Sequence, residues 1–204
     1  MSRMTFYTHP MSRGRIARWM MEEVGRPYDA VILDYGTTMK APAYLAVNPM
    51  GKVPALVHDG HVVTEVAAIC TYLADTFPEA GLMPKDRAAF YRWMFFAAGP
   101  VEQAVVNASF GWKPGTPHEV GRTGYGSLER VVETLSGHLA QSAFVCGDAF
   151  SAADIYLGSQ IGWGMQFGTL PGNPVFEAYW DRIKTRPALV AAQAIDDALL
   201  PPRT

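Results

Sequence analysis

Val53 and Pro54 are the first residues whose types and spacing point to a special backbone feature. They lie in the segment NPMGKVPALV, residues 48–57, where the proline opens an apolar stretch typical of a buried strand. Proline cannot donate to a β-ladder, so it belongs at a strand's first residue or at a sheet edge. The Val53–Pro54 bond can be cis, which turns the preceding backbone outward, or trans. Taken alone, this segment favours the trans form.

A second group with chemical potential lies in VTEVAAI, residues 63–69. Glu65 opens a predicted helix, with Thr64 as its N-cap. The free N–H groups and the dipole of a helix start suit a carboxylate ligand. Alternatively, Glu65 only complements the helix dipole. Ser12 stands just before the helical segment GRIARWMMEE and has a similar pair of roles, as a plain N-cap or as a hydroxyl donor.

Strands and helices alternate in the part of the chain that must position these residues. Residues 1–78 are predicted to form a small α/β domain in the order βαβ-α-ββα, with Asp59-Gly60 as a two-residue hairpin turn. The strands are expected at residues 4–7, 28–33, 54–58 and 61–64, and the helices at residues 14–25, 41–48 and 65–77.

After a linker at residues 79–87 the pattern becomes helical, and residues 88–204 are predicted to form an all-helical domain. Pro100 is expected to kink the first long helix, and Gly121, Gly124 and Gly126 to weaken the second one early. The helices are expected at residues 87–110, 118–142, 151–167, 174–186 and 187–200.

The composition is that of an ordinary globular protein, with 49% hydrophobic and 18% charged residues. A net charge of −2 gives no electrostatic reason to expect nucleic acid or an anionic membrane as a partner. We expect no membrane span or signal peptide. Cys70 and Cys146 are too far apart in sequence to form a C-x-x-C pair, and Cys70 lies on an apolar helix face. A reducing cytoplasm fits this pattern.

Four segments, in this order, resemble the cytosolic glutathione transferase superfamily over nearly the whole chain. They are FYTHPMSRGRIARWMMEE, NPMGKVPAL, VTEVAAICTYL and SAADIYLG. These motifs are similar to those of bacterial members with a serine-type active site. The resemblance implies a thioredoxin-like domain followed by a helical domain. It also implies glutathione as co-substrate, no metal, and a homodimer. A hydrophobic electrophile is expected over the glutathione and against the second domain.

The resemblance assigns residues to the peptide site. It implies a cis Pro54, with the N–H and C=O of Val53 paired to the cysteinyl part of glutathione. Glu65 meets the γ-glutamyl ammonium, the N–H of Val66 meets the γ-glutamyl carboxylate, and Lys52 steers the glycyl carboxylate. The family usually has serine where this chain has Val66, so we expect weak glutathione binding that Val66→Ser tightens.

The resemblance also indicates how the thiol is activated. A free thiol has a pKa of about 8.5, so the site must stabilise the thiolate. Ser12 stands where serine-type members keep their activating hydroxyl, and Tyr7 is the alternative. His9 and Arg13 are possible neighbours of the sulfur. No cysteine stands at this place, so mixed-disulfide chemistry is not expected.

We therefore expect an enzyme of detoxification that activates the glutathione thiol for attack on a small hydrophobic electrophile. Alternatives are a glutathione-dependent isomerase, lyase or dehalogenase on the same fold, or a non-catalytic binding module. The presence of Ser12 and Glu65 favours an enzyme. Ser151 and Asp154 form an S-x-x-D helix cap and are expected to be structural. The residues expected to line the electrophile pocket are His9, Phe110, Trp112, Trp163, Met165 and Phe167.

Overall fold

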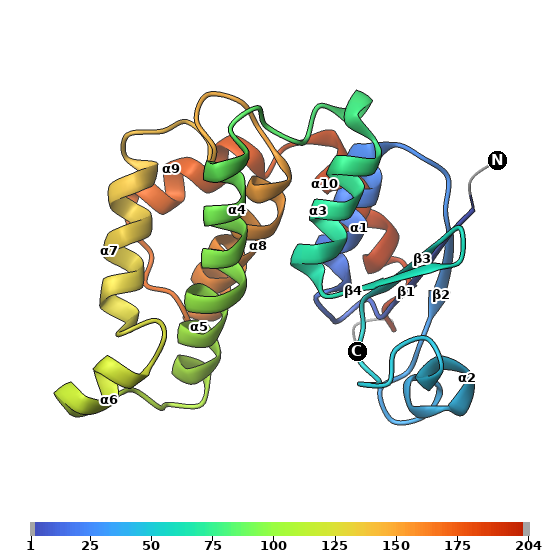
Figure 1. Cartoon of the computed structure of the whole chain (residues 1–204), viewed down its shortest axis with the longest axis horizontal. Coiled ribbons are helices and arrows are strands. Elements are labelled where there is room, and N and C mark those ends of the chain that lie inside the picture. The colour runs from blue at the N-terminus through green and yellow to red at the C-terminus, as the bar shows by residue number, and fades with distance from the viewer. Residues whose placement is uncertain (1–2, 202–204) are drawn as a thin grey trace. The chain divides into compact units, whose positions relative to one another are not determined.

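The computed structural model describes residues 3–201 of the 204-residue chain, and these residues form two compact units. Unit 1 comprises residues 3–81 and 186–201, and unit 2 comprises residues 82–185 (Figure 1). Both ends of the described chain therefore belong to unit 1, whereas unit 2 is one continuous segment.

The described part of unit 1 holds a sheet of four strands in the order β2-β1-β3-β4. β1 pairs parallel with β2 and antiparallel with β3, and β3 pairs antiparallel with β4. Asp59 and Gly60 join β3 to β4 with φ values of 48° and 85°, as a type I′ hairpin turn requires. The predicted βαβ-α-ββα order is confirmed. The strands are β1 (Met4–Thr8), β2 (Asp29–Ile32), β3 (Ala55–His58) and β4 (His61–Thr64).

The two faces of the sheet have different coverings, because successive side chains of a strand point to opposite sides. Phe6 is buried on the face of α1 (Gly14–Val24), which packs against α3 (Val66–Thr76). Tyr7 faces the other way, toward the short helix α2 (Pro42–Leu45) and a 3-10 turn at Thr38–Lys40. On that second face the buried cluster consists of Leu33, Met39, Tyr44 and Ala55.

The C-terminal helix α10 (Pro187–Asp197) packs along α1 within unit 1. The helical domain expected at residues 88–204 therefore includes a segment that belongs to the first compact unit instead. The apolar pattern of residues 187–200 specifies a helix but not the surface on which it packs. Three ion pairs join α1 to α10 or to the residue before it, namely Arg15 with Asp197, Arg18 with Asp196, and Glu23 with Arg186.

The pair of Arg18 and Asp196 is buried. Arg18 Nε lies 2.9 Å from Asp196 Oδ1, and the side chains are 2% and 0% exposed. Arg18 also donates to the Tyr28 hydroxyl at 3.0 Å, and its guanidinium lies over the ring of Phe6. Burial raises the pKa of Tyr28 to about 12, so this hydroxyl stays protonated and can in turn donate to Glu22.

Unit 2 is helical in its described residues, as predicted. α8 lies at its centre, with α4 and α9 packed against it, and residues 152–162 of α8 are all buried. The elements are α4 (Arg87–Phe96), a π-helical turn at Ala97–Val101, α5 (Glu102–Ser109), α6 (Pro117–Arg122), α7 (Leu128–Leu139), α8 (Ala152–Phe167) and α9 (Pro174–Ile183).

The interruption predicted at Pro100 takes the form of the π-helical turn between α4 and α5. Proline has no N–H to donate to the carbonyl four residues earlier, so the regular α-helical pattern cannot continue there. The carbonyl of Ala97 accepts from the N–H of Glu102 and from Gln160 Nε2 at 3.3 Å. The chain therefore passes from one helix into the next without a loop.

The long helix predicted at residues 118–142 was wrong, because the structure has two helices there, α6 and α7. The segment between them turns at Thr123, whose hydroxyl bonds the carbonyl of Gly126. Thr116 caps α6 with a capping box and Ser127 caps α7. Each helix thus has its own N-terminal signal. The glycines that were expected only to weaken one helix accompany a complete break.

The predicted cap at the start of α8 is confirmed as structural. Asp154 is fully buried and accepts hydrogen bonds from the N–H groups of Val145 and Ser151, at 2.7 and 2.9 Å. The hydroxyls of Ser151 and Tyr179 also donate to it, each at 2.9 Å. These four donors tie the loop before α8, the helix itself and α9 to one carboxylate.

We predict that Asp196→Ala lowers the free energy of unfolding by about 3–5 kcal/mol, because it leaves the buried charge of Arg18 unpaired. The neighbouring Asp197 provides a matched control, since its side chain is 61% exposed in its pair with Arg15. Asp197→Ala should cost no more than about 1 kcal/mol. Urea denaturation of both variants measures the difference, and equal losses would contradict the prediction.

Candidate functional site

The sheet register brings three sequence motifs to one edge of unit 1. Tyr7 pairs with Ala55 near the end of β1, and Ala55 pairs with Thr64 at the end of β4. Because β3 runs antiparallel to both neighbours, the residues before it lie beside the residues that follow β1 and β4. The Val53–Pro54 turn, the loop after β1 and the start of α3 therefore converge.

The Val53–Pro54 peptide bond is cis, as the resemblance implied. Among residues 3–201, the N–H and the C=O of Val53 form no hydrogen bond to another backbone group, and Val53 lies outside the strands and helices. The preceding carbonyl of Lys52 is occupied instead, by the Tyr44 hydroxyl at 2.5 Å and Asn48 Nδ2 at 2.8 Å. These two hydrogen bonds hold the turn in place through the residue before Val53. The backbone of Val53 itself suits pairing with an extended peptide.

Glu65 is the residue from which α3 starts, with φ 65° and ψ 125°. Thr64, the predicted N-cap, instead ends β4, and neither residue caps the helix through its side chain. The positive φ of a non-glycine residue is a strained conformation of the kind found at functional sites. The side chain of Glu65 is exposed, and the first N–H groups of α3 have no acceptor within the helix.

Val66 is the first residue of α3, and it is only 7% exposed. Its side chain therefore contributes to the apolar core of unit 1, while its N–H belongs to the unpaired first turn. A serine at this position would give up that apolar burial in exchange for a hydroxyl.

Ser12 holds the turn into α1 through its side chain. Its hydroxyl donates to the His9 carbonyl at 2.7 Å and accepts from the Gly14 N–H at 2.9 Å. Gly14 is needed for this packing, because a Cβ there would lie 2.0 Å from Thr8 Oγ1 and 2.9 Å from Ser12 Oγ. Ser12 is not the N-cap of α1, because that position is Arg13 and no side chain caps it. The single hydroxyl proton of Ser12 is used in the bond to the His9 carbonyl.

His9 is held in the same loop by a hydrogen bond at one ring nitrogen and by a contact with a second aromatic ring. Its Nδ1 accepts from the Met11 N–H at 3.1 Å, and its ring centroid lies 4.4 Å from that of Tyr35. The Tyr35 hydroxyl donates to the Met11 carbonyl at 2.9 Å. Sequence reasoning missed Tyr35, because nothing in the pattern around it indicates that its loop returns to the end of β1.

Tyr7, the alternative activating hydroxyl, lies on the sheet face that carries α2. Its ring packs against Tyr44 with centroids 5.3 Å apart, and it is only partly exposed. Tyr7 thus belongs to the packing of the buried cluster on that face. This agrees with its side-chain alternation along β1.

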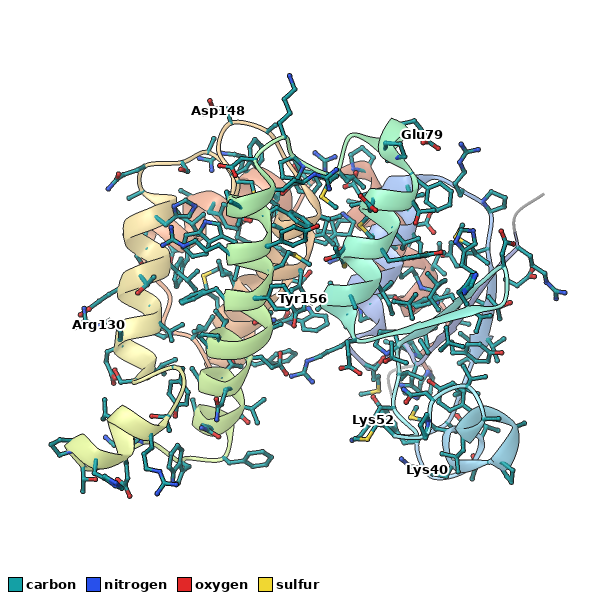
Figure 2. The ribbon with its side chains drawn as sticks, in the orientation of Figure 1. Lys40, Lys52, Glu79, Arg130, Asp148 and Tyr156 are labelled. Carbon is teal, nitrogen blue, oxygen red and sulfur yellow. The ribbon has the colours of Figure 1, made fainter. Side chains whose placement is uncertain are left out.

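Two lysines lie on the side of unit 1 that carries α2, as Figure 2 shows for Lys40 and Lys52. Lys40 Nζ donates to the Gly51 carbonyl at 2.6 Å, and Lys52 is exposed. Sequence reasoning named Lys52 but missed Lys40, whose only signal was its place just before the predicted helix at residues 41–48. Together they give this end of unit 1 a positive charge suited to a carboxylate.

Six residues were expected to contact an electrophile. His9 lies in unit 1, and the five apolar ones lie in unit 2. Phe110 follows α5 and is 83% exposed, and Trp112 lies two residues further on, also exposed. Phe167 ends α8 and is 69% exposed. Trp163 and Met165, also in α8, are partly buried and contribute to packing.

Neither cysteine has an ionisable thiol at neutral pH. Cys70 is fully buried, which raises its pKa, and burial raises the pKa of Cys146 to about 11. The burial predicted for Cys70 is therefore confirmed. Within residues 3–201, no cluster of His, Cys, Asp and Glu is arranged to hold a metal ion. In the same range, no helix is long and apolar enough to cross a bilayer.

Two family models match this chain. One describes the N-terminal domain of glutathione S-transferase and matches residues 11–76; the other describes its C-terminal domain and matches residues 101–163. Glutathione S-transferase GstA of Escherichia coli O157:H7 is 32% identical over 150 residues, which is 71% of this chain and 73% of that protein.

Solved structures are similar over almost the full length. A glutathione transferase from Methylococcus capsulatus strain Bath is 32% identical with a TM-score of 0.76, over 96% of this chain and 99% of that one. A sphingomonad glutathione S-transferase, complexed with glutathione, is 29% identical with a TM-score of 0.75, over 95% and 98%. The chain belongs to the glutathione S-transferase family.

Proposed function

We propose that the chain binds glutathione at the edge of unit 1 and activates its thiol for attack on a small hydrophobic electrophile. The observation that carries the proposal is the convergence of the Val53 backbone, the start of α3 and the loop after β1. These supply an extended backbone partner, a site for a carboxylate and a place for the thiol. Relatives named glutathione S-transferase, one of them complexed with glutathione, support the same conclusion.

Each part of the tripeptide has a counterpart in this site. The N–H and C=O of Val53 pair with the cysteinyl backbone, because a peptide is well held by backbone groups. The N–H groups at the start of α3 bind the γ-glutamyl carboxylate, and the exposed Glu65 carboxylate meets the γ-glutamyl ammonium. Lys40 and Lys52 provide the positive charge for the glycyl carboxylate at the other end of the tripeptide.

The thiol requires a donor that stabilises its anion. Lowering a thiol pKa by two units corresponds to about 2.7 kcal/mol. Ser12 is the hydroxyl at this place, and Tyr7 is the alternative on the α2 face. Ser12 can act on the sulfur only by giving up its bond to the His9 carbonyl.

The electrophile is proposed to be apolar, in keeping with the exposed aromatic side chains of Phe110, Trp112 and Phe167. The conjugation reaction consumes glutathione, whereas an isomerase or lyase on this fold would regenerate it. We further propose that the protein works in the cytoplasm, in line with its two free cysteines.

We predict that the purified protein is retained on immobilised glutathione and eluted by free glutathione. It should also consume the glutathione thiol in stoichiometric amounts when an electrophile such as an activated aryl halide is added. Thiol titration during turnover separates the candidates, since turnover of an electrophile with unchanged thiol would indicate an isomerase instead. Retention without any turnover across a panel of electrophiles would favour a binding module.

We predict that Glu65→Gln weakens glutathione binding about tenfold, because a hydrogen bond to a charged group is worth roughly 1.5–3 kcal/mol and water partly replaces it at an exposed site. Calorimetry with glutathione measures the dissociation constant. Glu79→Gln is the control, because Glu79 is also an exposed glutamate of unit 1, near the other end of α3 from Glu65 (Figure 2). Equal affinities for both variants would contradict the role of Glu65.

We propose that the protein is a homodimer that uses α4, on which Tyr91 and Phe95 are 45% and 72% exposed at successive helical turns. Sedimentation at micromolar concentration should therefore give twice the chain mass of 22.3 kDa. Phe95→Lys should shift the protein toward a monomer, because a charge in an apolar interface lacks a partner. Phe110→Lys, at a similarly exposed phenylalanine off α4, should not. A wild-type monomer would reject the proposal.

A further inference from the structure

Besides the guanidinium of Arg13, the loop at residues 9–13 contains two side chains that could donate a hydrogen bond to a thiolate, Ser12 and His9. A hydroxyl has one proton, and that of Ser12 is directed to the His9 carbonyl, while its oxygen accepts from the Gly14 N–H. Ser12 is therefore engaged on both sides by the backbone of its own loop. Its hydroxyl accounts for the shape of the turn into α1.

His9 has the opposite arrangement, with one ring nitrogen engaged and the other not. Nδ1 accepts a hydrogen bond from the Met11 N–H, so in the neutral ring this atom carries no proton. The proton of the neutral imidazole is therefore on Nε2. Within residues 3–201, Nε2 takes part in no hydrogen bond or ion pair, and the side chain is only partly buried.

The orientation of the ring is set before any ligand arrives. The ring packs against that of Tyr35 in a tilted arrangement, and the Tyr35 hydroxyl donates to the Met11 carbonyl. The residue that supplies the N–H to Nδ1 is thus held by the same tyrosine that holds the ring. A donor fixed in this way needs little reorganisation when a negative charge forms near it.

The loop stands at the edge where the peptide is proposed to bind. Continuing the antiparallel pairing of Tyr7 with Ala55 by two residues brings the chain at His9 beside Val53. Val53 is the residue proposed to pair with the cysteinyl part of glutathione. The cysteinyl sulfur leaves the peptide backbone at that residue, one short side chain away from the loop.

We infer that His9 is the catalytic donor, and that its Nε2–H hydrogen-bonds the thiolate sulfur of bound glutathione; this inference rests on the proposed function. A charge-assisted N–H bond to an anion is stronger than a neutral one and favours the ionised thiol. Ser12 then holds the loop, and its bond to the His9 carbonyl does not have to break.

The chemical step leaves the imidazole unchanged. The S–H proton of glutathione goes to solvent when the thiol ionises, and His9 keeps its own proton throughout. A sulfur electron pair then forms the bond to the electrophilic carbon, and the leaving group departs with the electrons of its bond to that carbon. The hydrogen bond from Nε2 weakens as the sulfur loses its charge.

Two amide substitutions separate the roles of the two ring nitrogens. In His9→Asn, the side-chain oxygen can accept from the Met11 N–H, as Nδ1 of the histidine does, so the turn is kept. The shorter side chain has no donor at the position of Nε2. In His9→Gln, the longer amide places an N–H₂ group near the position of Nε2. We measure the pKa of bound glutathione from its thiolate absorbance, together with its dissociation constant and kcat/KM near neutral pH.

We expect His9→Asn to raise the pKa of the bound thiol by about one unit, a tenfold change in its ionisation constant. kcat/KM near neutral pH should fall at least tenfold, and the dissociation constant of glutathione should change less than threefold. His9→Gln should retain most of the wild-type thiol pKa. An unchanged thiol pKa in His9→Asn, or equal losses in both variants, would overturn the inference.

Ser12→Ala tests the competing donor in the same titration. A higher thiol pKa in Ser12→Ala, with none in His9→Asn, assigns the role to the serine and rejects His9. Failure of the wild-type protein to bind glutathione at all would reject the proposed function, and the inference with it. Binding with an unperturbed thiol pKa in the wild type would reject the inference alone.

The tautomer of His9 provides a test that needs no glutathione. ¹⁵N NMR of the imidazole, assigned by the signal missing in His9→Asn, should show the neutral ring protonated at Nε2. Protonation at Nδ1 would overturn the inference, because Nδ1 could not then accept from Met11 and Nε2 would have no proton to donate.

Discussion

The antiparallel pairing of β3 with both of its neighbours is the constraint on which the site depends. It places the residues before β3 beside the ends of β1 and β4 at the same time. The loop after β1, the Val53–Pro54 turn and the start of α3 therefore meet at one edge of the sheet. A shift of one residue in this register would turn the side chains of β3 to the opposite face and separate the segments.

What converges at that edge is mostly backbone. The Val53 peptide groups and the N–H groups of α3 make the proposed contacts to glutathione, and the carbonyl of Lys52 is tied down by Tyr44 and Asn48. Backbone recognition requires that the chain be held in place, because a peptide group cannot adjust as a long side chain can. This accounts for the buried cluster under α2 and for the strained φ of Glu65.

Local sequence motifs predicted most of this arrangement, whereas contacts between residues far apart in the sequence were missed. Asp59-Gly60 gave the hairpin, and Ser151 with Asp154 gave the cap of α8, because both patterns act within a few residues. The docking of α10 on α1 was not predictable in the same way. It depends on Arg18 and Asp196, which are 178 positions apart. For the same reason Tyr35 went unnoticed, although its ring fixes His9.

The loop after β1 shows how docking of a distant helix can reach the proposed chemistry. Arg15 donates to the Pro10 carbonyl at 3.1 Å and pairs with Asp197 of α10 at 2.6 Å. The loop is thus held by Ser12 from within, by Tyr35 from the segment after β2, and by Arg15 from α1. A loop fixed on three sides leaves little freedom for a hydroxyl to turn toward a ligand, which favours a donor that is already oriented.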